Sequence, residues 1–283
     1  MSIAAIARRQ FLGSAIGASA LALAGCNEPT QSASDKPTRV FDGILGLQLY
    51  TVRELFEKDA RATLNALAEI GYKDCETAGL FEHDPKDVRM MMDDLGLVSR
   101  SAHIRLPALR DGLEKDLEIA ETLGQDKMYL GWIPEEERTL DKYRALADLL
   151  NARGEETKAA GIQIGYHNHE FEFIEDNGTT GYDILLDRTD SELVTLELDF
   201  FWAHLAKVDP VELFNKAPGR FTSCHIKDST AEGEMVPVGD GVIDFTSIFE
   251  HAQTAGMERF YVEHDNPQDA LASLGRSFAS LTD

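Results

Sequence analysis

Apolar and polar positions follow two alternating periods along this chain. Short runs rich in β-branched and aromatic residues are separated by longer stretches with a helical repeat of apolar residues. In "RATLNALAEIGY", for example, Leu64, Leu67 and Ile70 share one helical face, and Gly71 follows as a helix-ending residue. The pattern predicts strands at residues 45–50, 72–77, 97–103, 127–132, 162–167, 193–199, 221–226 and 259–263.

Strict alternation of strand and helix favours parallel strands joined by right-handed crossovers. Eight such units within about 240 residues predict an α/β fold, a closed (β/α)₈ TIM barrel of parallel strands over residues 43–283. A doubly wound open sheet is the alternative. No Gly-x-Gly-x-x-Gly follows the first predicted strand, which disfavours a dinucleotide-binding version of that alternative.

The segment before the first strand has the layout of an export signal. Arg8 and Arg9 precede an apolar, small-residue run from Phe11 to Gly25, which is shorter than the roughly 20 residues of a membrane-spanning helix. "RRQFL" resembles a twin-arginine signal, and "LAGC" resembles a bacterial lipobox. We therefore expect a signal peptide at 1–25, a lipidated Cys26 with a flexible tether at 26–42, and a lipoprotein on the periplasmic face of a bacterial membrane. The alternative is a plain secretory signal with an incidental cysteine.

The composition is that of an acidic globular protein. The chain has 283 residues, 43% of them hydrophobic, and a net charge of −23. Such a surface repels phosphate backbones, and no basic cluster follows the first ten residues, so a nucleic-acid partner is disfavoured. Cys75 and Cys224 fall in predicted strands, and we expect two small buried residues rather than a disulfide.

Polar side chains gather where the predicted strands end. In a barrel of this type the active site lies at the C-terminal ends of the strands. One histidine or aspartate at a strand end is usually a loop hydrogen-bonding residue, but a collection on one rim indicates a site. The residues at these ends are Glu76, His103, His167, Asn168, His169, Glu170, Glu197, Asp199, His225, Lys227, Asp228, Glu263, His264 and Asp265.

A mixed set of imidazoles and carboxylates suits one divalent ion such as Mn, Co, Zn or Fe. The last inward-pointing position of each strand should supply the ligand, which indicates Asp199 on the sixth strand, His225 on the seventh and Glu263 on the eighth. Glu197 shares the parity of Asp199 but lies a layer deeper. For the fifth strand the alternatives are His167, His169 and Glu170.

Several segments resemble the xylose-isomerase-like TIM barrels, also called the sugar phosphate isomerase/epimerase superfamily. They are "GYHNHEFEF", "LELDFFW", "CHIKD", "VGDGVIDF" and "YVEHD", and the likeness runs from about Gly43 to the end. "HIKD" followed by "VPVGDGVIDF" is especially similar to the inosose-dehydratase-like branch. The resemblance implies one metal ion held by Glu, Asp, His and Glu on strands five to eight, which here fall on His167, Asp199, His225 and Glu263.

Two positions depart from the ketose epimerases of that superfamily. The strand-five glutamate is replaced by "YHNH", and the histidine three residues beyond the strand-six aspartate is replaced by Trp202, with His204 two further on. A metal-bound His167 nitrogen does not also act as a base. The resemblance therefore implies proton abstraction next to a carbonyl and loss of a β-substituent, with Glu263 or Lys227 moving the proton. Lys227 can instead remain charged and stabilise an oxyanion. The substrate-binding residues expected are Glu76, His103, His169 and Trp202.

These observations predict a divalent-metal-dependent lyase, dehydratase or isomerase acting on a sugar, cyclitol or keto-sugar through an enediolate. A ketose-type epimerase and a non-catalytic carbohydrate-binding lipoprotein are the alternatives. A DNA-repair enzyme related to endonuclease IV, another member of the superfamily, is opposed by the charge of −23.

Overall fold

The computed structural model describes residues 43–283. The predicted export signal, Cys26 and the tether lie outside the described residues. Within 43–283, the helices are all too short or too polar to cross a membrane. All eight predicted strands form, as β1 (Gly46–Gln48), β2 (Asp74–Glu76), β3 (Ser101–Ile104), β4 (Lys127–Leu130), β5 (Gln163–His167), β8 (Val194–Asp199), β9 (Phe221–Ile226) and β12 (Arg259–Val262).

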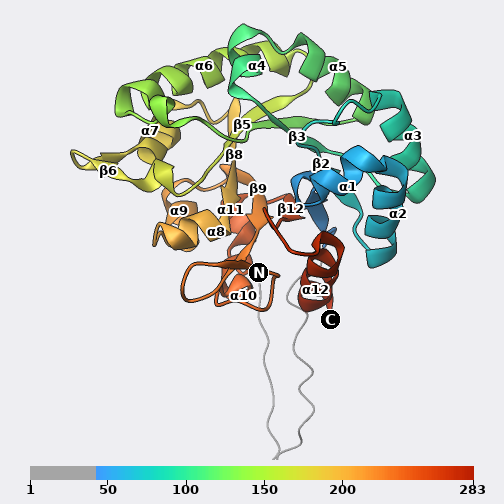
Figure 1. Cartoon of the computed structure of the whole chain (residues 1–283). Helices are drawn as coiled ribbons and strands as arrows, with labels where there is room; N and C mark the ends of the chain where they lie inside the picture. Colours follow the sequence, from blue (N-terminus) through green and yellow to red (C-terminus); the bar gives the residue numbers. More distant parts are fainter. Residues whose placement is uncertain (1–42) are drawn as a thin grey trace, which may run out of the picture. The chain divides into compact units, whose positions relative to one another are not determined.

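The eight strands form one parallel sheet that curls into a ring (Figure 1). Its order is β2-β1-β12-β9-β8-β5-β4-β3. Isolated parallel bridges then join β2 to β3, at Asp74 with Val98 and at Thr77 with Ala102. The His103 amide, for example, donates to the Thr77 carbonyl at 2.7 Å. The predicted (β/α)₈ barrel is therefore confirmed, and the C-terminal ends of all its strands share one rim.

Helices connect the strands and cover the outside of the ring. In α2, Leu64 and Leu67 are buried, and the helix ends at Gly71 with φ 125°, as the sequence predicts. The helices are α1 (Arg53–Lys58), α2 (Ala60–Ile70), α3 (Pro85–Leu95), α4 (Leu106–Asp111), α5 (Glu114–Leu123), α6 (Leu140–Lys158), α7 (Gly181–Arg188), α8 (Phe200–Leu205), α9 (Pro210–Lys216), α10 (Phe245–Phe249), α11 (Ala252–Ala255) and α12 (Ala270–Thr282).

Short elements interrupt several of the loops. Three 3₁₀ turns occur at Leu49–Val52, Glu135–Glu137 and Phe171–Phe173. Two small antiparallel hairpins pair β6 (Glu175–Asp176) with β7 (Thr179–Thr180), and β10 (Asp228–Ser229) with β11 (Met235–Val236).

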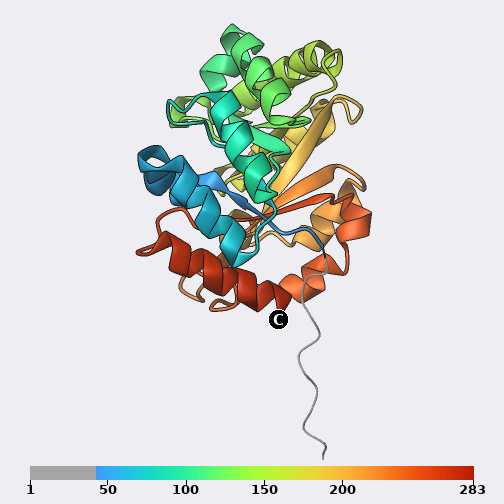
Figure 2. The ribbon, with the colours of Figure 1, turned by 90° about the vertical axis from the view of Figure 1, so that its right-hand side faces the viewer.

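The last helix packs beside the first strand–helix unit (Figure 2). The Tyr72 hydroxyl donates to the Leu274 carbonyl of α12 at 3.0 Å. A Cβ atom at Gly71 would lie 2.5 Å from the Phe278 ring, so both its positive φ and this close approach require glycine. This contact completes the outer layer of helices.

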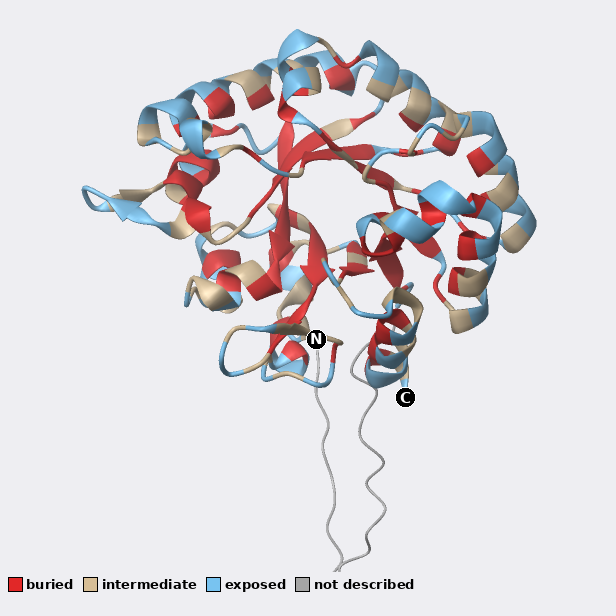
Figure 3. Ribbon diagram, viewed as in Figure 1, coloured by how far each residue is buried: buried red, intermediate tan, exposed pale blue. Residues whose placement is uncertain are grey.

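The strands are buried on both sides, as in Figure 3. Their outward side chains, such as Leu47 and Ile164, belong to the apolar core under the helices. Their inward side chains begin with two tyrosine rings: Tyr261 fills the space beside Gly46, and Tyr129 fills the space beside Gly165. The Tyr261 hydroxyl donates to the buried Asp74 at 3.0 Å, so polar groups also lie level with these rings. The histidines and carboxylates of the predicted site occupy the inward positions above them. Cys75 and Cys224 are free and buried, as expected.

Candidate metal centre at the barrel mouth

The inward positions at the C-terminal ends of the strands open into a cavity of about 740 Å³. Five predicted site residues line it: His103, His167, His169, Lys227 and Glu263. Its walls come from segments that follow the other strands, and include Tyr50, Ala78, Arg105, Gly131, Trp132 and Asp265.

Three predicted metal ligands converge beside this cavity. One ligand atom each of Asp199, His225 and Glu263 lies within 4.8 Å of the others. His225 Nδ1 is 2.7 Å from Glu263 Oε2 and 4.0 Å from Asp199 Oδ2. Both His225 Nδ1 and Asp199 Oδ2 are buried without a hydrogen bond, and their charged neighbours are Glu263 Oε2 for His225 and Lys227 Nζ, at 3.0 Å, for Asp199. Buried donor atoms that converge without bonding each other fit a cation held about 2.0–2.3 Å from each of them.

Asp199 is held so that one oxygen points into the site. Its Oδ1 caps helix α8 by accepting from the amides of Phe201 at 2.9 Å and Trp202 at 3.2 Å. Its own amide donates to Asn168 Oδ1 at 2.9 Å, which joins the ends of β5 and β8. Burial raises the pKa of Asp199 to about 6. Oδ2 is therefore the oxygen that faces the site, where Lys227 Nζ lies 3.0 Å from it.

The fifth strand contributes His167. Its Nε2 lies 3.8 Å from Asp199 Oδ2, and its Nδ1 lies 3.3 Å from Glu197 Oε2. Burial holds the pKa of His167 well below its usual range, so the imidazole is neutral, as a metal ligand must be. His169, by contrast, stacks on Phe171 with ring centroids 5.2 Å apart. Of the strand-five alternatives, His167 is thus the imidazole with a nitrogen facing Asp199. It also belongs to a second cluster of possible ligands with His103, Glu197 and His225.

Short contacts already engage most of that second cluster, although His167 Nδ1 is buried without a hydrogen bond. His103 Nε2 lies 2.6 Å from Glu197 Oε2, and His225 Nε2 lies 2.6 Å from Glu76 Oε2. Glu197 Oε1 also accepts from Ser223 at 2.7 Å. Since these nitrogens are engaged, the cluster is a hydrogen-bonded layer that orients the histidines, beneath the Asp199, His225 and Glu263 set.

Glu76 belongs to this lower layer rather than to the cavity wall. It has no exposed surface, and it accepts from Gln48 Nε2 at 2.8 Å and from Ser101 Oγ at 2.6 Å besides its contact with His225. The sequence predicts it to bind substrate, yet both its oxygens already have protein partners. Glu197 is likewise fully buried and one layer below Asp199, as its parity indicates.

Lys227 bridges the carboxylates of the site. Its Nζ is 3.0 Å from Asp199 Oδ2 and 2.7 Å from both Glu263 Oε2 and Asp265 Oδ1. Burial would lower the pKa of Lys227, but these three carboxylates outweigh it and hold the pKa well above its usual range. Lys227 is therefore an ammonium ion in this structure. Its ion pair with Asp265 has no counterpart among the contacts expected from the sequence.

His169 and Trp202 form the side of the site next to β5. The two rings are 5.2 Å apart, and Lys227 Nζ is 5.7 Å from the centre of the Trp202 ring. Burial lowers the pKa of His169 to about 3, so a neutral imidazole lines the cavity. Trp202 is not among the lining residues; it packs behind His169, and its Nε1 is buried without a hydrogen-bond partner.

The "GDGVIDF" segment is held in place by the aspartate that follows Lys227. Asp228 Oδ2 accepts from the amides of Gly239 at 2.9 Å and Gly241 at 3.0 Å, and Oδ1 accepts from Ser229 at 2.8 Å and Ile243 at 3.2 Å. A Cβ atom at Gly241 would lie 2.2 Å from Asp228 Oδ1, so only glycine allows this approach. The role of Asp228 is thus to fix a rim loop.

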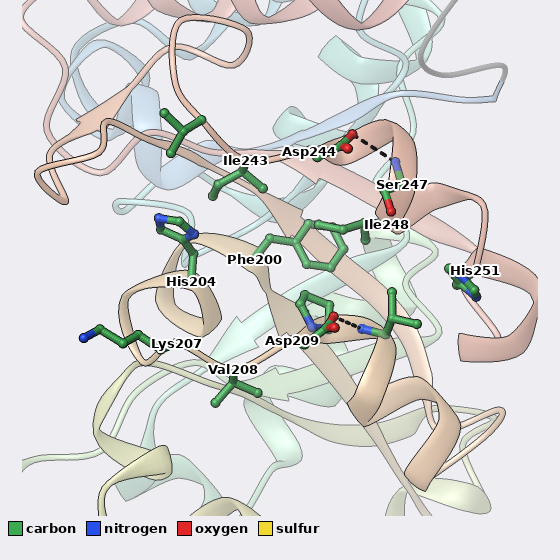
Figure 4. A pocket seen from close by; sticks show the side chains of 13 residues that line it. Phe200, His204, Lys207, Val208, Asp209, Ile243, Asp244, Ser247, Ile248 and His251 are labelled. Carbon is green, nitrogen blue, oxygen red and sulfur yellow. Dashed lines mark hydrogen bonds between the residues drawn. The ribbon is translucent and has the colours of Figure 1, made fainter.

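A second hollow of about 570 Å³ lies outside the ring, next to α8, α9 and α10 (Figure 4). Two of its carboxylates are committed to helix caps, since Asp209 accepts from the Val211 amide at 2.8 Å and Asp244 from the Ser247 amide at 3.1 Å. His204 and His251 lie on opposite sides of it. The convergent donor atoms of the described residues lie in the barrel mouth instead.

Known proteins share this fold and are similar to this chain in sequence at 26–29% identity. A family model described as "Xylose isomerase-like TIM barrel" matches residues 42–281. Inosose dehydratase of Geobacillus kaustophilus (strain HTA426) is 26% identical over 66% of this chain and 73% of its own length. Inosose dehydratase of Lacticaseibacillus casei is 28% identical over 48% of this chain and 51% of its own length. A sugar phosphate isomerase/epimerase from Parabacteroides distasonis ATCC 8503 is 29% identical over 89% of this chain and 97% of that chain, with a TM-score of 0.75.

Proposed function

The chain belongs to the xylose isomerase-like TIM barrel family, and on that premise we propose that it is a metal-dependent enzyme that modifies a sugar, cyclitol or keto-sugar. The observation that carries the proposal is the convergence of the buried ligand atoms of Asp199, His225 and Glu263 beside a cavity of about 740 Å³. The relatives named above support the class of substrate.

The ligands that fit a divalent ion are Asp199 Oδ2, His225 Nδ1 and Glu263, with His167 Nε2 as the fourth. Mixed imidazole and carboxylate donors suit Mn, Co, Zn or Fe. Bound there, a divalent ion supplies the positive charge that polarises a substrate carbonyl. Glu76 and Glu197 hold the histidine rings in the required orientation from below.

Glu263 and the groups around it in the cavity are suited to moving a proton next to a carbonyl. Glu263 makes its contacts with His225 and Lys227 through Oε2, which leaves Oε1 to take a proton from substrate carbon. The Lys227 ammonium stabilises the enediolate charge that results. His103 and the neutral imidazole of His169 accept or donate to substrate hydroxyls from the cavity wall. Loss of a β-substituent, which leaves with a proton as water or an alcohol, completes a lyase or dehydratase reaction.

A ketose-type epimerase is the second candidate function. His169 and Glu263 reach the cavity from β5 and β12, on different sides of the ring, so two proton-moving groups are available to the two faces of one carbon. The likeness to the Parabacteroides distasonis isomerase/epimerase supports this reading, and the likeness to the inosose dehydratases supports elimination.

The test combines metal analysis with proton nuclear magnetic resonance in D₂O. The full-length protein is reconstituted with Mn²⁺, Co²⁺, Zn²⁺ or Fe²⁺ and incubated with 2-keto-myo-inositol and with 3-keto-glucosides. Elimination releases the β-substituent, whereas epimerisation incorporates solvent deuterium at a stereocentre without release. We expect about one ion per chain, and loss of both metal and turnover in Asp199→Asn and His225→Ala. Stoichiometric metal without turnover of any keto-sugar would favour a carbohydrate-binding lipoprotein, and absence of metal in the wild type contradicts the proposal.

We also propose that the protein acts outside the cytoplasm as a lipoprotein. The support is the sequence of residues 1–26, with Arg8 and Arg9 ahead of an apolar run and Cys26 behind it. Membrane fractionation of a bacterial host that expresses the full chain tests this. Cys26→Ser should release the protein from the membrane fraction, and lysine at both arginine positions should block export.

A further inference from the structure

The cavity at the barrel mouth carries two exposed aromatic side chains that the proposed chemistry does not use. Among the described residues, Tyr50 and Trp132 are the aromatic members of the exposed large hydrophobic side chains, at 40% and 51% exposure. Both line this one cavity. Exposed aromatic surface that faces a ligand cavity, rather than open surface, indicates a contact with ligand.

The two rings stand on different sides of the mouth. Tyr50 follows β1 and Trp132 follows β4, and these strands are separated by β2 and β3 around the ring. Trp132 comes directly after Gly131, where a Cβ atom would lie 2.5 Å from His103 Nδ1. The tryptophan is thus placed one residue beyond the point at which β4 touches the His103 ring, next to the reacting end of the cavity.

Each ring has an arginine near it, although Arg138 lies closer to Phe171, at 3.5 Å, than to Trp132. The Arg53 guanidinium lies 4.1 Å above the Tyr50 ring and donates to the carbonyls of Tyr50 at 2.8 Å and Asp265 at 2.7 Å. The Arg138 guanidinium lies 5.7 Å from the Trp132 ring and donates twice to the neighbouring Ile133 carbonyl, at 3.2 and 3.1 Å. A ring that is held in place before binding, as Tyr50 is by Arg53, loses little conformational entropy when a ligand stacks on it.

The cavity is also larger than a single sugar ring needs. Its volume of about 740 Å³ falls in the upper part of the roughly 300–1,000 Å³ range of pockets that enclose drug-sized ligands. A monosaccharide at the metal ligands would leave the aromatic end filled with water. The apolar C–H face of a second pyranose ring, or an aromatic aglycone, matches an exposed aromatic face.

From these features we infer that Tyr50 and Trp132 form a subsite for the second ring of a glycoside, so that the substrate is a two-ring glycoside rather than a free monosaccharide. The inference rests on the proposed function for the position of the reacting ring. Trp132 is the main stacking surface because it is the larger and more exposed of the two rings. Tyr50 closes the opposite side, and Arg53 links it to the loop that holds Asp265 against Lys227.

Calorimetric binding to the full-length protein, with and without Mn²⁺, tests the subsite without turnover. The probes are cellobiose and 4-nitrophenyl β-D-glucopyranoside, which have two rings, and methyl β-D-glucopyranoside, which has one. We expect the two-ring probes to bind the wild type about tenfold tighter or more. Trp132→Ala should remove that preference and leave the one-ring affinity unchanged, whereas Trp132→Phe should retain most of it. Ile174→Ala, which alters an exposed apolar residue outside the cavity, is the matched control.

Equal affinities for one-ring and two-ring probes in the wild type would overturn the inference, as would absence of binding by all three. A preference that survives Trp132→Ala together with Tyr50→Ala would also overturn it. Failure of the proposed function has a different signature. If the protein prefers two-ring probes through Trp132 but neither retains metal nor converts a keto-sugar, the subsite is supported and the proposed enzymatic function is contradicted.

Discussion

His225 on β9 and Glu76 on β2 lie 2.6 Å apart, Nε2 to Oε2, and neither side chain is exposed. The other nitrogen of His225 faces Glu263 and Asp199. A carboxylate on one imidazole nitrogen and a ligand position on the other is the arrangement that orients a metal-bound histidine and raises its basicity. Glu76 therefore acts through His225, from across the ring.

Glu76→Gln should weaken metal binding while leaving the barrel folded. The amide is isosteric but lacks the charge that attracts the His225 N–H, so we expect an affinity for Mn²⁺ or Zn²⁺ lower by about 10–100-fold. Competition with a chelator of known affinity measures the change. Glu82→Gln, at an exposed position that does not line the cavity, is the control. An unchanged metal affinity in Glu76→Gln would show that His225 does not depend on this contact.

Lys227→Met should have opposite effects on stability and metal affinity. Without metal, the substitution leaves Asp199, Glu263 and Asp265 without their shared ammonium, which should lower the free energy of unfolding by about 3–5 kcal/mol. Removing a positive charge beside the ligands should also tighten cation binding. Urea unfolding with and without Mn²⁺ measures both, and metal should restore much of the lost stability.

The control for Lys227→Met is Lys216→Met, which removes an ammonium from an exposed pair with Asp183. Such pairs contribute about 0–1 kcal/mol to the free energy of unfolding, so Lys216→Met should unfold nearly as the wild type does, both with and without Mn²⁺. If Lys227→Met were as stable as the control in the absence of metal, the three carboxylates would not depend on the lysine.

Asp228→Ala should loosen the rim loop that contains Gly239 and Gly241. Four backbone amides would lose the carboxylate that accepts from them. Because a single hydrogen bond to a charged group contributes about 1.5–3 kcal/mol, we expect the free energy of unfolding to fall by at least about 3 kcal/mol. Hydrogen exchange at the amides of Gly239, Gly241 and Ile243 should accelerate. Asp240→Ala, in the same loop but exposed and paired only with Arg276 among the described residues, should change little.

Glu172 should make stability fall as the pH rises. Burial raises its pKa from the ordinary 4.5 to about 7, although Tyr166 and the His169 amide donate to it at 2.5 and 2.7 Å. Folding therefore takes up a proton between these two values. The contribution of the buried neutral carboxyl is fully present below about pH 4.5 and is lost as the pH rises through about 7, a loss of roughly 3 kcal/mol.

Glu172→Gln should remove most of this pH dependence, because the amide is neutral throughout. Chemical unfolding at several pH values between 5 and 8 gives the slopes for the variant and the wild type. Glu175→Gln, at an exposed position of the same loop, should keep the wild-type slope. Parallel slopes in Glu172→Gln and wild type would mean that Glu172 is ionised throughout the range.

The strand–helix order and the residues of the rim were predictable from sequence. Apolar side chains such as Leu47 and Ile164 occupy the outward positions of the strands, and glycines end several helices. The secondary structure that the local sequence favours is therefore the one that the barrel contains. The inward parity of Asp199, His225 and Glu263 also follows from the pattern, because side chains of a strand alternate with a period of two.

Depth and partners were not predictable in this way. Glu76 was expected to bind substrate, but it lies under His225. Trp202 was also expected to bind substrate, but it packs against His169 and does not line the cavity. No role was predicted for Asp265, Tyr50 or Trp132, which do line it. A local signal for Asp265 exists in "EHD", but none indicates that it meets Lys227.

The sequence by itself thus determined which strands form and which face each side chain takes, because both depend on residues near in the chain. Only the tertiary structure decided which inward side chains meet, since the tilt and stagger of the closed ring set their height and neighbours. That is why Asp199, His225 and Glu263 converge beside the cavity, while the carboxylates of Glu76 and Glu197 serve as supports one layer below.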